Sequence, residues 1–172
     1  MTTKPITALL CALALPALAG DDAGLIKSAE SAAPASVTAK ATIKTMDGKV
    51  LRQGSNGWVC YPGDKNSGPM CNMPGWDKLF EAYMKKGPLS VDGIAFSYML
   101  AGEGEAPGVS NIDPFATAPT PDNDWIKEGP HLMILVPDPA LLEGLPTDPS
   151  EPVYVMWKGT PYAHIMVRIK EQ

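Results

Sequence analysis

The sequence predicts an α+β fold, with a mainly antiparallel β-sheet, one packed amphipathic helix and long loops rich in proline and glycine. Short segments rich in β-branched and aromatic residues are bounded by glycine, proline, asparagine and aspartate, which is typical of strands. Strands and one well-formed helix follow one another without a regular β-α-β alternation, which disfavours a doubly wound sheet. A length of 172 residues with 18 prolines and 16 glycines indicates a single, loop-rich domain.

The first twenty residues have the pattern of an export signal. Lys4 precedes a short apolar run over 6–18, and small residues two apart precede the expected cleavage site. The run is too short to span a bilayer, and no later stretch is long enough. We therefore predict a signal peptide over 1–20 and one α+β domain over 21–172. The domain is expected in the periplasm or outside the cell, without membrane insertion after cleavage.

Cysteine content and charge narrow the class of protein. Cleavage would remove Cys11 and leave Cys60 and Cys71, which we expect to form a disulfide in an oxidising compartment. Loss of Lys4 would leave 13 basic and 19 acidic residues, a net charge of −6. This charge, with no basic patch and no amphipathic helix rich in lysine and arginine, argues against nucleic-acid and membrane-surface partners.

The N-terminal half is expected to hold a short helix, a hairpin and a loop. Asp22 can cap the helix. Residues 41–52 predict a hairpin, in which Asp47-Gly48 supplies the two positive-φ positions of a type I′ turn. The stretch over 60–76, rich in proline and glycine, predicts an irregular surface loop closed by the disulfide.

The strongest helical pattern covers residues 76–86, immediately before Gly87-Pro88. Its apolar residues recur at helical spacing and form a wide stripe that needs a sheet to pack on. They are Trp76, Leu79, Phe80, Tyr83 and Met84. Core packing explains these aromatic residues better than a ligand-binding box does.

A strand, a long loop and a short helix are expected next. Residues 91–100 predict the strand, and residues 137–144 predict a helix of one or two turns. Between them, residues 102–128 form a loop with Phe115 and Trp125 as its expected anchors. Loops of this length are uncommon inside compact domains and are often functional or mobile.

Both histidines of the chain open the same short pattern in two predicted strands. The pattern is His131-x-Met133 in the first strand and His164-x-Met166 in the second. Residues two apart on a strand share a face, so each imidazole should stand beside a thioether.

The two strands at the C-terminus are expected to form a hairpin with a tight turn over 159–162. That register sets Trp157 opposite His164 and Val155 opposite Met166. The other face is then the more continuous core face, and it carries Tyr154, Met156, Ile165, Val167 and Ile169.

A metal site follows if the strand over 131–136 lies beside this hairpin. Its ligands would be His131, Met133, His164 and Met166, with Trp157 beside them. Imidazole nitrogen and thioether sulfur together suit copper, particularly Cu(I), much better than hard cations. We therefore predict a small exported binding protein whose ligand surface includes the 102–128 loop. Copper is the most specific ligand that this prediction names.

Five strings of residues stand out in the mature chain. They are Gly54-Ser55-Asn56-Gly57-Trp58-x-Cys60, Pro69-Met70-Cys71, Ser110-Asn111-x-Asp113-Pro114-Phe115-Ala116-Thr117, Gly129-Pro130-His131-x-Met133 and Tyr154-Val155-Met156-Trp157-x-Gly159-Thr160-Pro161-Tyr162-x-His164-x-Met166. These strings resemble those of a family of small exported bacterial proteins. The resemblance implies export and one undivided domain, and it implies no particular activity.

Other interpretations stay open at this point. Methionine is a common filler of irregular cores, and a half-buried histidine on a sheet usually hydrogen-bonds a neighbour, so the twin pattern can be purely structural. One histidine could act as general base in a hydrolase-like enzyme, although no G-x-S-x-G motif is present. A structural or interaction domain of the cell envelope is the third hypothesis.

Overall fold

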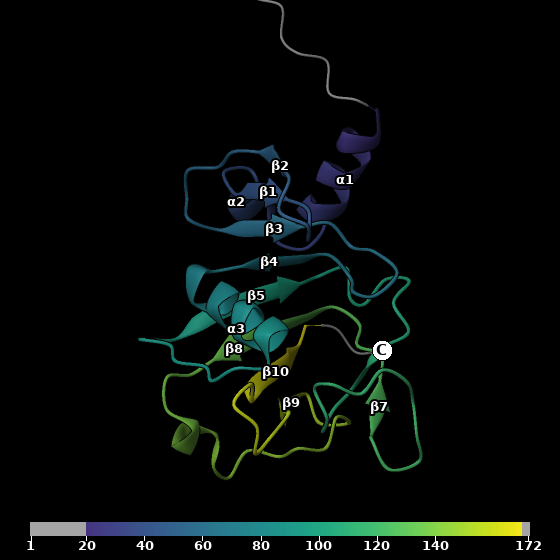
Figure 1. Cartoon of the computed structure of the whole chain (residues 1–172), viewed down its shortest axis with the longest axis vertical. Helices are drawn as coiled ribbons and strands as arrows, with labels where there is room; N and C mark the ends of the chain where they lie inside the picture. Colours follow the sequence, from purple (N-terminus) through teal and green to yellow (C-terminus); the bar gives the residue numbers. More distant parts are fainter. Residues whose placement is uncertain (1–19, 170–172) are drawn as a thin grey trace, which may run out of the picture.

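The computed structural model describes residues 20–169 and confirms the α+β class (Figure 1). Its main sheet has eight strands in the order β2-β1-β3-β4-β5-β8-β10-β9, and every neighbouring pair is antiparallel except β1 and β3. Apart from Gly20, the predicted signal peptide lies outside the described residues.

The helices are α1 (Gly20–Glu30), α2 (Ala35–Thr38) and α3 (Pro74–Lys85), and a 3₁₀ turn, η1, spans Pro139–Leu142. The strands of the main sheet are β1 (Thr42–Lys44), β2 (Val50–Arg52), β3 (Val59–Tyr61), β4 (Met70–Asn72), β5 (Ala95–Met99), β8 (His131–Leu135), β9 (Val153–Met156) and β10 (His164–Arg168). A separate two-stranded sheet pairs β6 (Val109–Ser110) with β7 (Trp125–Ile126).

The hairpin predicted over 41–52 is confirmed as β1 and β2, but the predicted type I′ turn is wrong. Only Gly48 has a positive φ, of 95°, whereas Asp47 does not. The Gly48 amide donates to the Thr45 carbonyl at 2.9 Å, and the Thr45 amide donates to the Lys49 carbonyl at 2.9 Å. This is a type I turn followed by a left-handed glycine, the usual three-residue hairpin loop.

The chain crosses itself closely between β2 and β3. Strand β3 pairs with β1 on the side away from β2, so the connection must pass the start of β1. A Cβ on Gly54 would lie 2.2 Å from the backbone of residues 41–42, so only glycine fits there. The Ser55 amide then donates to the Lys40 carbonyl at 2.8 Å. Backbone crossing therefore explains the glycine that opens the first string.

The disulfide between Cys60 and Cys71 is confirmed, and the loop that it closes is shorter than predicted, because both cysteines lie in strands. The two cysteines are directly opposite one another on β3 and β4, with Cα atoms 4.0 Å apart and both side chains fully buried. They join Ile43 and the alanines of the α1 region in one apolar cluster. Only residues 62–69 and Met73 of the predicted loop lack regular structure.

Helix α3 packs on the opposite face of the sheet, in front of the strands in Figure 1. It begins at Pro74, a favoured first position, and ends where Lys86 adopts a left-handed conformation with φ 51°. Its buried residues are Trp76, Leu79 and Ala82. Met84, which the predicted stripe included, is 66% exposed.

The C-terminal hairpin is present, but its predicted register is wrong by one residue. His164 lies opposite Met156 and Met166 lies opposite Tyr154, instead of opposite Trp157 and Val155. The reason is the loop, which extends over 157–163 instead of four residues and begins with Trp157 at φ 56°. A slip of one residue exchanges the faces of a strand. Tyr154 and Met156 therefore share the buried face with the histidine.

The 102–128 segment is more ordered than its sequence indicates, because it contains β6 and β7. Its two predicted anchors are confirmed. The Trp125 Nε1–H donates to the Pro107 carbonyl at 2.9 Å, and the Phe115 ring stacks on Tyr83 at 5.3 Å.

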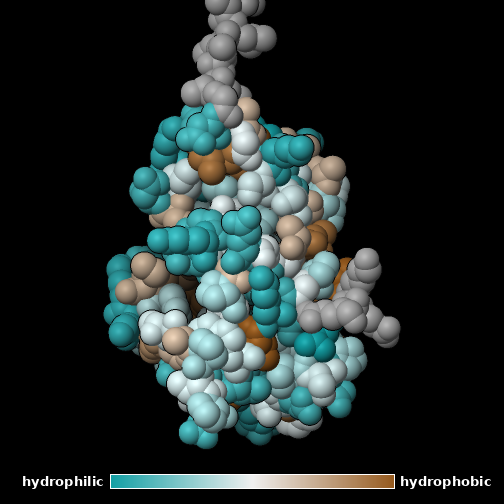
Figure 2. Space-filling model, turned by 90° about the vertical axis from the view of Figure 1, so that its right-hand side faces the viewer, coloured by the Kyte–Doolittle hydropathy of each residue, from teal (hydrophilic) through white to brown (hydrophobic). Residues whose placement is uncertain are grey.

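The surface is mainly hydrophilic in the view of Figure 2, where brown apolar atoms form separate patches instead of one broad area. The large apolar residues that are exposed are scattered along the chain: Met46, Val50, Met84, Ile94, Ile112, Leu141, Val153 and Ile169. No helix within residues 20–169 is long and apolar enough to cross a bilayer.

Removing the disulfide is expected to destabilise the protein. The two cysteines are 11 positions apart, and a loop of this size corresponds to about 3 kcal/mol in the chain-entropy model. We expect the double variant Cys60→Ala/Cys71→Ala to lose about this much free energy of unfolding in urea titrations. Dithiothreitol should lower the urea midpoint of the native protein and leave that of the variant unchanged. A variant as stable as the oxidised protein would contradict this account.

Candidate functional site

The histidines and most of the buried methionines lie on the face of the sheet that α3 covers. Met133 on β8 and Met166 on β10 are directly opposite one another, with His131 and His164 two residues away in opposite directions. Cross-strand partners share a face of the sheet. The condition on which the predicted site depended, that the two strands are neighbours, is therefore met, and four of the five predicted site residues share one surface.

The two imidazoles do not meet. His131 lies opposite Arg168, which is four residues along β10 from His164, so the two residues are roughly 13 Å apart along the strands. A single ion bound by both histidines, as the sequence suggested, is thus not the arrangement that this register favours.

Each histidine instead has two methionine neighbours of its own, and the arrangement is the same for both. His131 has Met133 two residues along its strand and Met99 directly across on β5. His164 has Met166 two residues along its strand and Met156 directly across on β9. Each end of the face therefore presents one nitrogen and two sulfur atoms. Sequence reasoning missed Met99 because the pairing of β5 with β8 is not local, and missed Met156 because the register was wrong.

His164 is fully buried, and one of its nitrogen atoms has no partner. Its Nδ1 lies 2.9 Å from the Tyr162 carbonyl oxygen, which can only accept, so Nδ1 carries the proton. Nε2 is then a bare lone pair. It is one of two buried side-chain atoms without a hydrogen bond in the part of the chain that the structure describes. Buried polar atoms without partners are rare, and leaving one unpaired costs about 1–3 kcal/mol.

Two tryptophans enclose the His164 ring. Trp76 from α3 and Trp157 from the loop after β9 have centroids 5.2 Å and 5.1 Å from it, both at nearly right angles. Burial in this apolar setting lowers the pKa of His164 to about 4. The imidazole is therefore neutral near pH 7, with its lone pair available.

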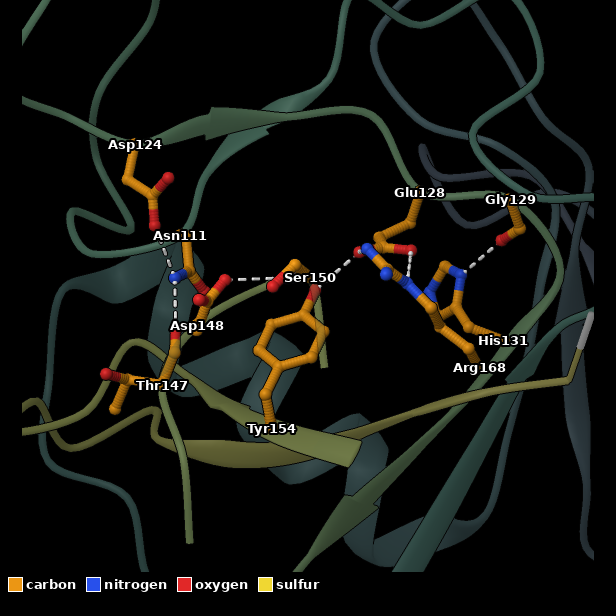
Figure 3. Close-up of polar contacts among 10 residues, drawn as sticks. All are labelled: Asn111, Asp124, Glu128, Gly129, His131, Thr147, Asp148, Ser150, Tyr154 and Arg168. Atoms are coloured by element: carbon orange, nitrogen blue, oxygen red, sulfur yellow. Dashed lines mark hydrogen bonds and ion pairs between the residues drawn. The ribbon is translucent and has the colours of Figure 1, made fainter. Parts of the chain in front are cut away.

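Trp157 touches His164 as predicted, but from the loop and not from across the strand. Its amide donates to the Asn111 carbonyl and its Nε1–H to the Ser110 carbonyl, both at 2.8 Å. Asn111 is in turn held by Asp124 at 2.7 Å and by the Thr147 carbonyl at 2.9 Å (Figure 3). The Ser-Asn string thus positions this tryptophan.

An aromatic cluster closes the site on the side of α3. The Tyr83 ring is stacked between Trp157 at 5.7 Å and Phe115 at 5.3 Å. The Tyr162 hydroxyl donates to the Gly87 carbonyl at 2.9 Å, which joins the 157–163 loop to the end of the helix. The Asp-Pro-Phe string and the last string therefore meet here for packing reasons.

His131 lies beside a buried ion pair. Its Nδ1 is 2.7 Å from the Gly129 carbonyl, and burial lowers its pKa. The Glu128 side chain, 1% exposed, accepts from Arg168 at 2.9 Å and from the Tyr154 hydroxyl at 2.7 Å (Figure 3). Because Arg168 faces His131, a positive charge stands next to this end of the methionine face.

The geometry does not support the hydrolase hypothesis, because no nucleophile is aligned with a histidine base. Both Nδ1 atoms contact main-chain carbonyls. The hydroxyls of Ser97 and Ser110 donate elsewhere, to Asn72 at 2.6 Å and to the Asn123 carbonyl at 2.5 Å. Acyl transfer by a triad requires a serine, a histidine and a third orienting group linked by hydrogen bonds, and these serines and histidines are not linked in that way.

A hard metal ion has no set of ligands among residues 20–169, where no group of three or more His, Cys, Asp or Glu residues could hold it. A metal on this face would depend on thioether sulfur.

Searches of protein-family models, curated proteins and solved structures found no match to this chain. The resemblance to small exported bacterial proteins stays a prediction.

The buried histidines are expected to make stability depend on pH. An unfolded histidine has a pKa of about 6.5, so the unfolded chain takes up a proton at His164 at a higher pH than the folded chain does. Stability should be unaffected by this group above pH 6.5 and should fall as the pH drops toward 4. The expected loss from pH 7 to about pH 4.5 is 2–3 kcal/mol, with a further contribution of the same sign from His131.

The measurement is urea unfolding at both pH values for the native protein and for His164→Phe, which cannot titrate. Subtracting the variant cancels the carboxylates that both proteins share. Equal pH dependence in the two proteins would show that His164 is not held neutral by the fold.

Proposed function

We propose that this chain is an exported binding protein for a soft, monovalent metal ion. Cu(I) is the ion that the donor set fits best. The ligands are Nε2 of His164 and the sulfur atoms of Met156 and Met166. The disulfide and the absence of a membrane-crossing helix within residues 20–169 are compatible with export.

The observation that carries this proposal is the unpartnered Nε2 of His164, on a residue that has Met156 directly across and Met166 two residues along its strand. The tautomer is set by the Tyr162 carbonyl, so the lone pair needs no deprotonation to bind an ion near neutral pH. Imidazole and thioether are the ligands that soft cuprous ion accepts. An unpaired acceptor that costs stability in the free protein would gain a partner in the bound one.

Charge favours a monovalent ion over a divalent one. His164, Met156 and Met166 are all neutral, so the ion brings uncompensated charge into an apolar interior. The cost of transferring an ion into a low-dielectric medium is of order 20 kcal/mol for a single charge and rises with the square of the charge. The transfer cost is therefore lower for the monovalent ions Cu(I) and Ag(I) than for the divalent ions Zn²⁺ and Cu²⁺.

Entry requires the 157–163 loop to move, because Nε2 of His164 is sealed from solvent. Lys158, Gly159 and Pro161 in this loop are exposed. A cavity of about 60 Å³ lies against the loop, lined in part by Thr160, Pro161 and Ala163 and by Leu135 of β8. The loop therefore borders free space.

The test is an anaerobic titration of the signal-cleaved protein with Cu(I) against a competing chelator, and with Ag(I), which needs no reductant and leaves the disulfide intact. We expect His164→Phe to lower the affinity by roughly 100-fold or more, or about 3 kcal/mol, because no other nitrogen points into this set. Met156→Leu and Met166→Leu, which conserve volume, should each weaken binding without unfolding the protein.

Met70→Leu is the matched control, since Met70 is a buried methionine of the same core that lies two strands from β8. It should bind as the native protein does. Native protein that binds no more tightly than His164→Phe would rule out this function and leave the imidazole as a packing residue.

A further inference from the structure

We propose that the same face binds a second soft ion at its opposite end, through His131, Met99 and Met133, and that the facing pair Met133 and Met166 passes the ion on to His164. This inference rests on the proposed function. It adds a second site, which accepts the ion first, and a route between the two sites.

The second site repeats the chemistry of the first one. His131 has a methionine two residues along its strand and another directly across, as His164 does. Its Nδ1 is also committed to a main-chain carbonyl, that of Gly129, so its Nε2 is the lone pair. The chain contains only two histidines, and both have this surrounding.

Solvent contact distinguishes the two ends. The Nε2 of His131 makes no hydrogen bond, yet it is not among the sealed atoms without a partner, whereas Nε2 of His164 is. An atom that is neither paired nor sealed keeps some contact with solvent. Both histidines are only 1% exposed, and they differ in that Nε2 of His164 is sealed whereas Nε2 of His131 is not, so an ion from solution meets the nitrogen of His131 first.

Surrounding charge also distinguishes the two ends of the face. Arg168 lies opposite His131 on β10, and its guanidinium is held there by Glu128 at 2.9 Å and 3.1 Å (Figure 3). Glu128 also accepts from the Tyr154 hydroxyl at 2.7 Å, and its carboxylate acts on the His131 imidazole more strongly than Arg168 does. A cation at His131 therefore meets both charges of this ion pair, whereas a cation at His164 meets neither.

The two methionines between the sites are spaced for transfer. Cross-strand side chains have Cβ atoms about 4.5–5.5 Å apart, so the Met133 and Met166 sulfur atoms can hold one ion between them. Each of these methionines also belongs to one of the end sites. Transfer then exchanges one ligand at a time: Met166 replaces Nε2 of His131, Nε2 of His164 replaces Met99, and Met156 replaces Met133. The ion keeps its single positive charge, and no electron or proton moves.

The site itself supplies a reporter. Trp76 and Trp157 lie 5.2 Å and 5.1 Å from the His164 ring, so a metal ion bound there should quench their fluorescence. Within residues 20–169, the tryptophan rings that contact a histidine ring contact that of His164. Fluorescence therefore follows loading of the inner site, while total bound metal counts both sites.

The experiment combines metal counting with stopped-flow fluorescence on the signal-cleaved protein, using Ag(I). We expect two ions per native chain and one per chain in His131→Phe. In His131→Phe the inner site should keep its affinity and full quenching, but it should load at least about tenfold more slowly, because the ion must then wait for the loop to open. His164→Phe should bind one ion, without quenching.

Met133→Leu tests the route and is paired with Met70→Leu as control. Slower quenching in Met133→Leu, with native kinetics in Met70→Leu, supports transfer. One ion per native chain, with unchanged kinetics in His131→Phe, would overturn this inference and leave the proposed function standing. Absence of binding in the native protein would remove both.

Discussion

The pairing of β10 with β8 on one side and β9 on the other decides which side chains meet in this protein. With the observed register, histidine and methionine side chains face α3. The alternate residues of the same strands, among them Leu132, Ile134, Ile165 and Val167, face the other way. Because a strand repeats every two residues, a shift by one position would exchange these sets completely. The imidazole environments, the tryptophan contacts and the ion pair at Arg168 all depend on that single alignment.

The alignment is maintained from outside the hairpin. Trp157 adopts a left-handed conformation, which costs a non-glycine residue about 1–2 kcal/mol. Its two hydrogen bonds to residues 110 and 111 hold it there. Asn111 is itself anchored to the segment that leads into β9. The long segment before β8 therefore acts as a brace for the C-terminal hairpin, which gives its length a structural purpose.

Local signals allowed correct predictions where the relevant contacts are local. The hairpin around Gly48, the helix that carries Trp76 and the pairing of the two remaining cysteines all follow from residues close together in the chain. The predictions were wrong where contacts between distant segments determine the local conformation or the neighbours of a residue. The left-handed Trp157 is stabilised by residues more than forty positions away, so a tight four-residue turn was the natural but wrong expectation. The same applies to Met99, which meets His131 only because β5 and β8 are neighbours.

Histidine and methionine were identified from sequence by composition and spacing, but their grouping was not. Adjacency of the two strands was left open by the sequence, and it is present. The separation of the imidazoles to opposite ends follows from antiparallel pairing centred on Met133 and Met166, which no pattern within either strand encodes. The state of Nε2 on His164 also lies beyond sequence, since it depends on which carbonyl occupies Nδ1.

The position of the disulfide has a consequence for the order in which the molecule can assemble. Both cysteines belong to strands that are consecutive in the chain, and the elements around them, α1 to β4, all precede α3. In a chain that is threaded through a membrane with its N-terminus leading, this half can emerge, pair its strands and be oxidised while the rest is still inside. The covalent bond then fixes the β3–β4 hairpin as a template edge to which β5, β8, β10 and β9 are added one after another. The methionine-rich face would thus be the last part of the protein to be completed.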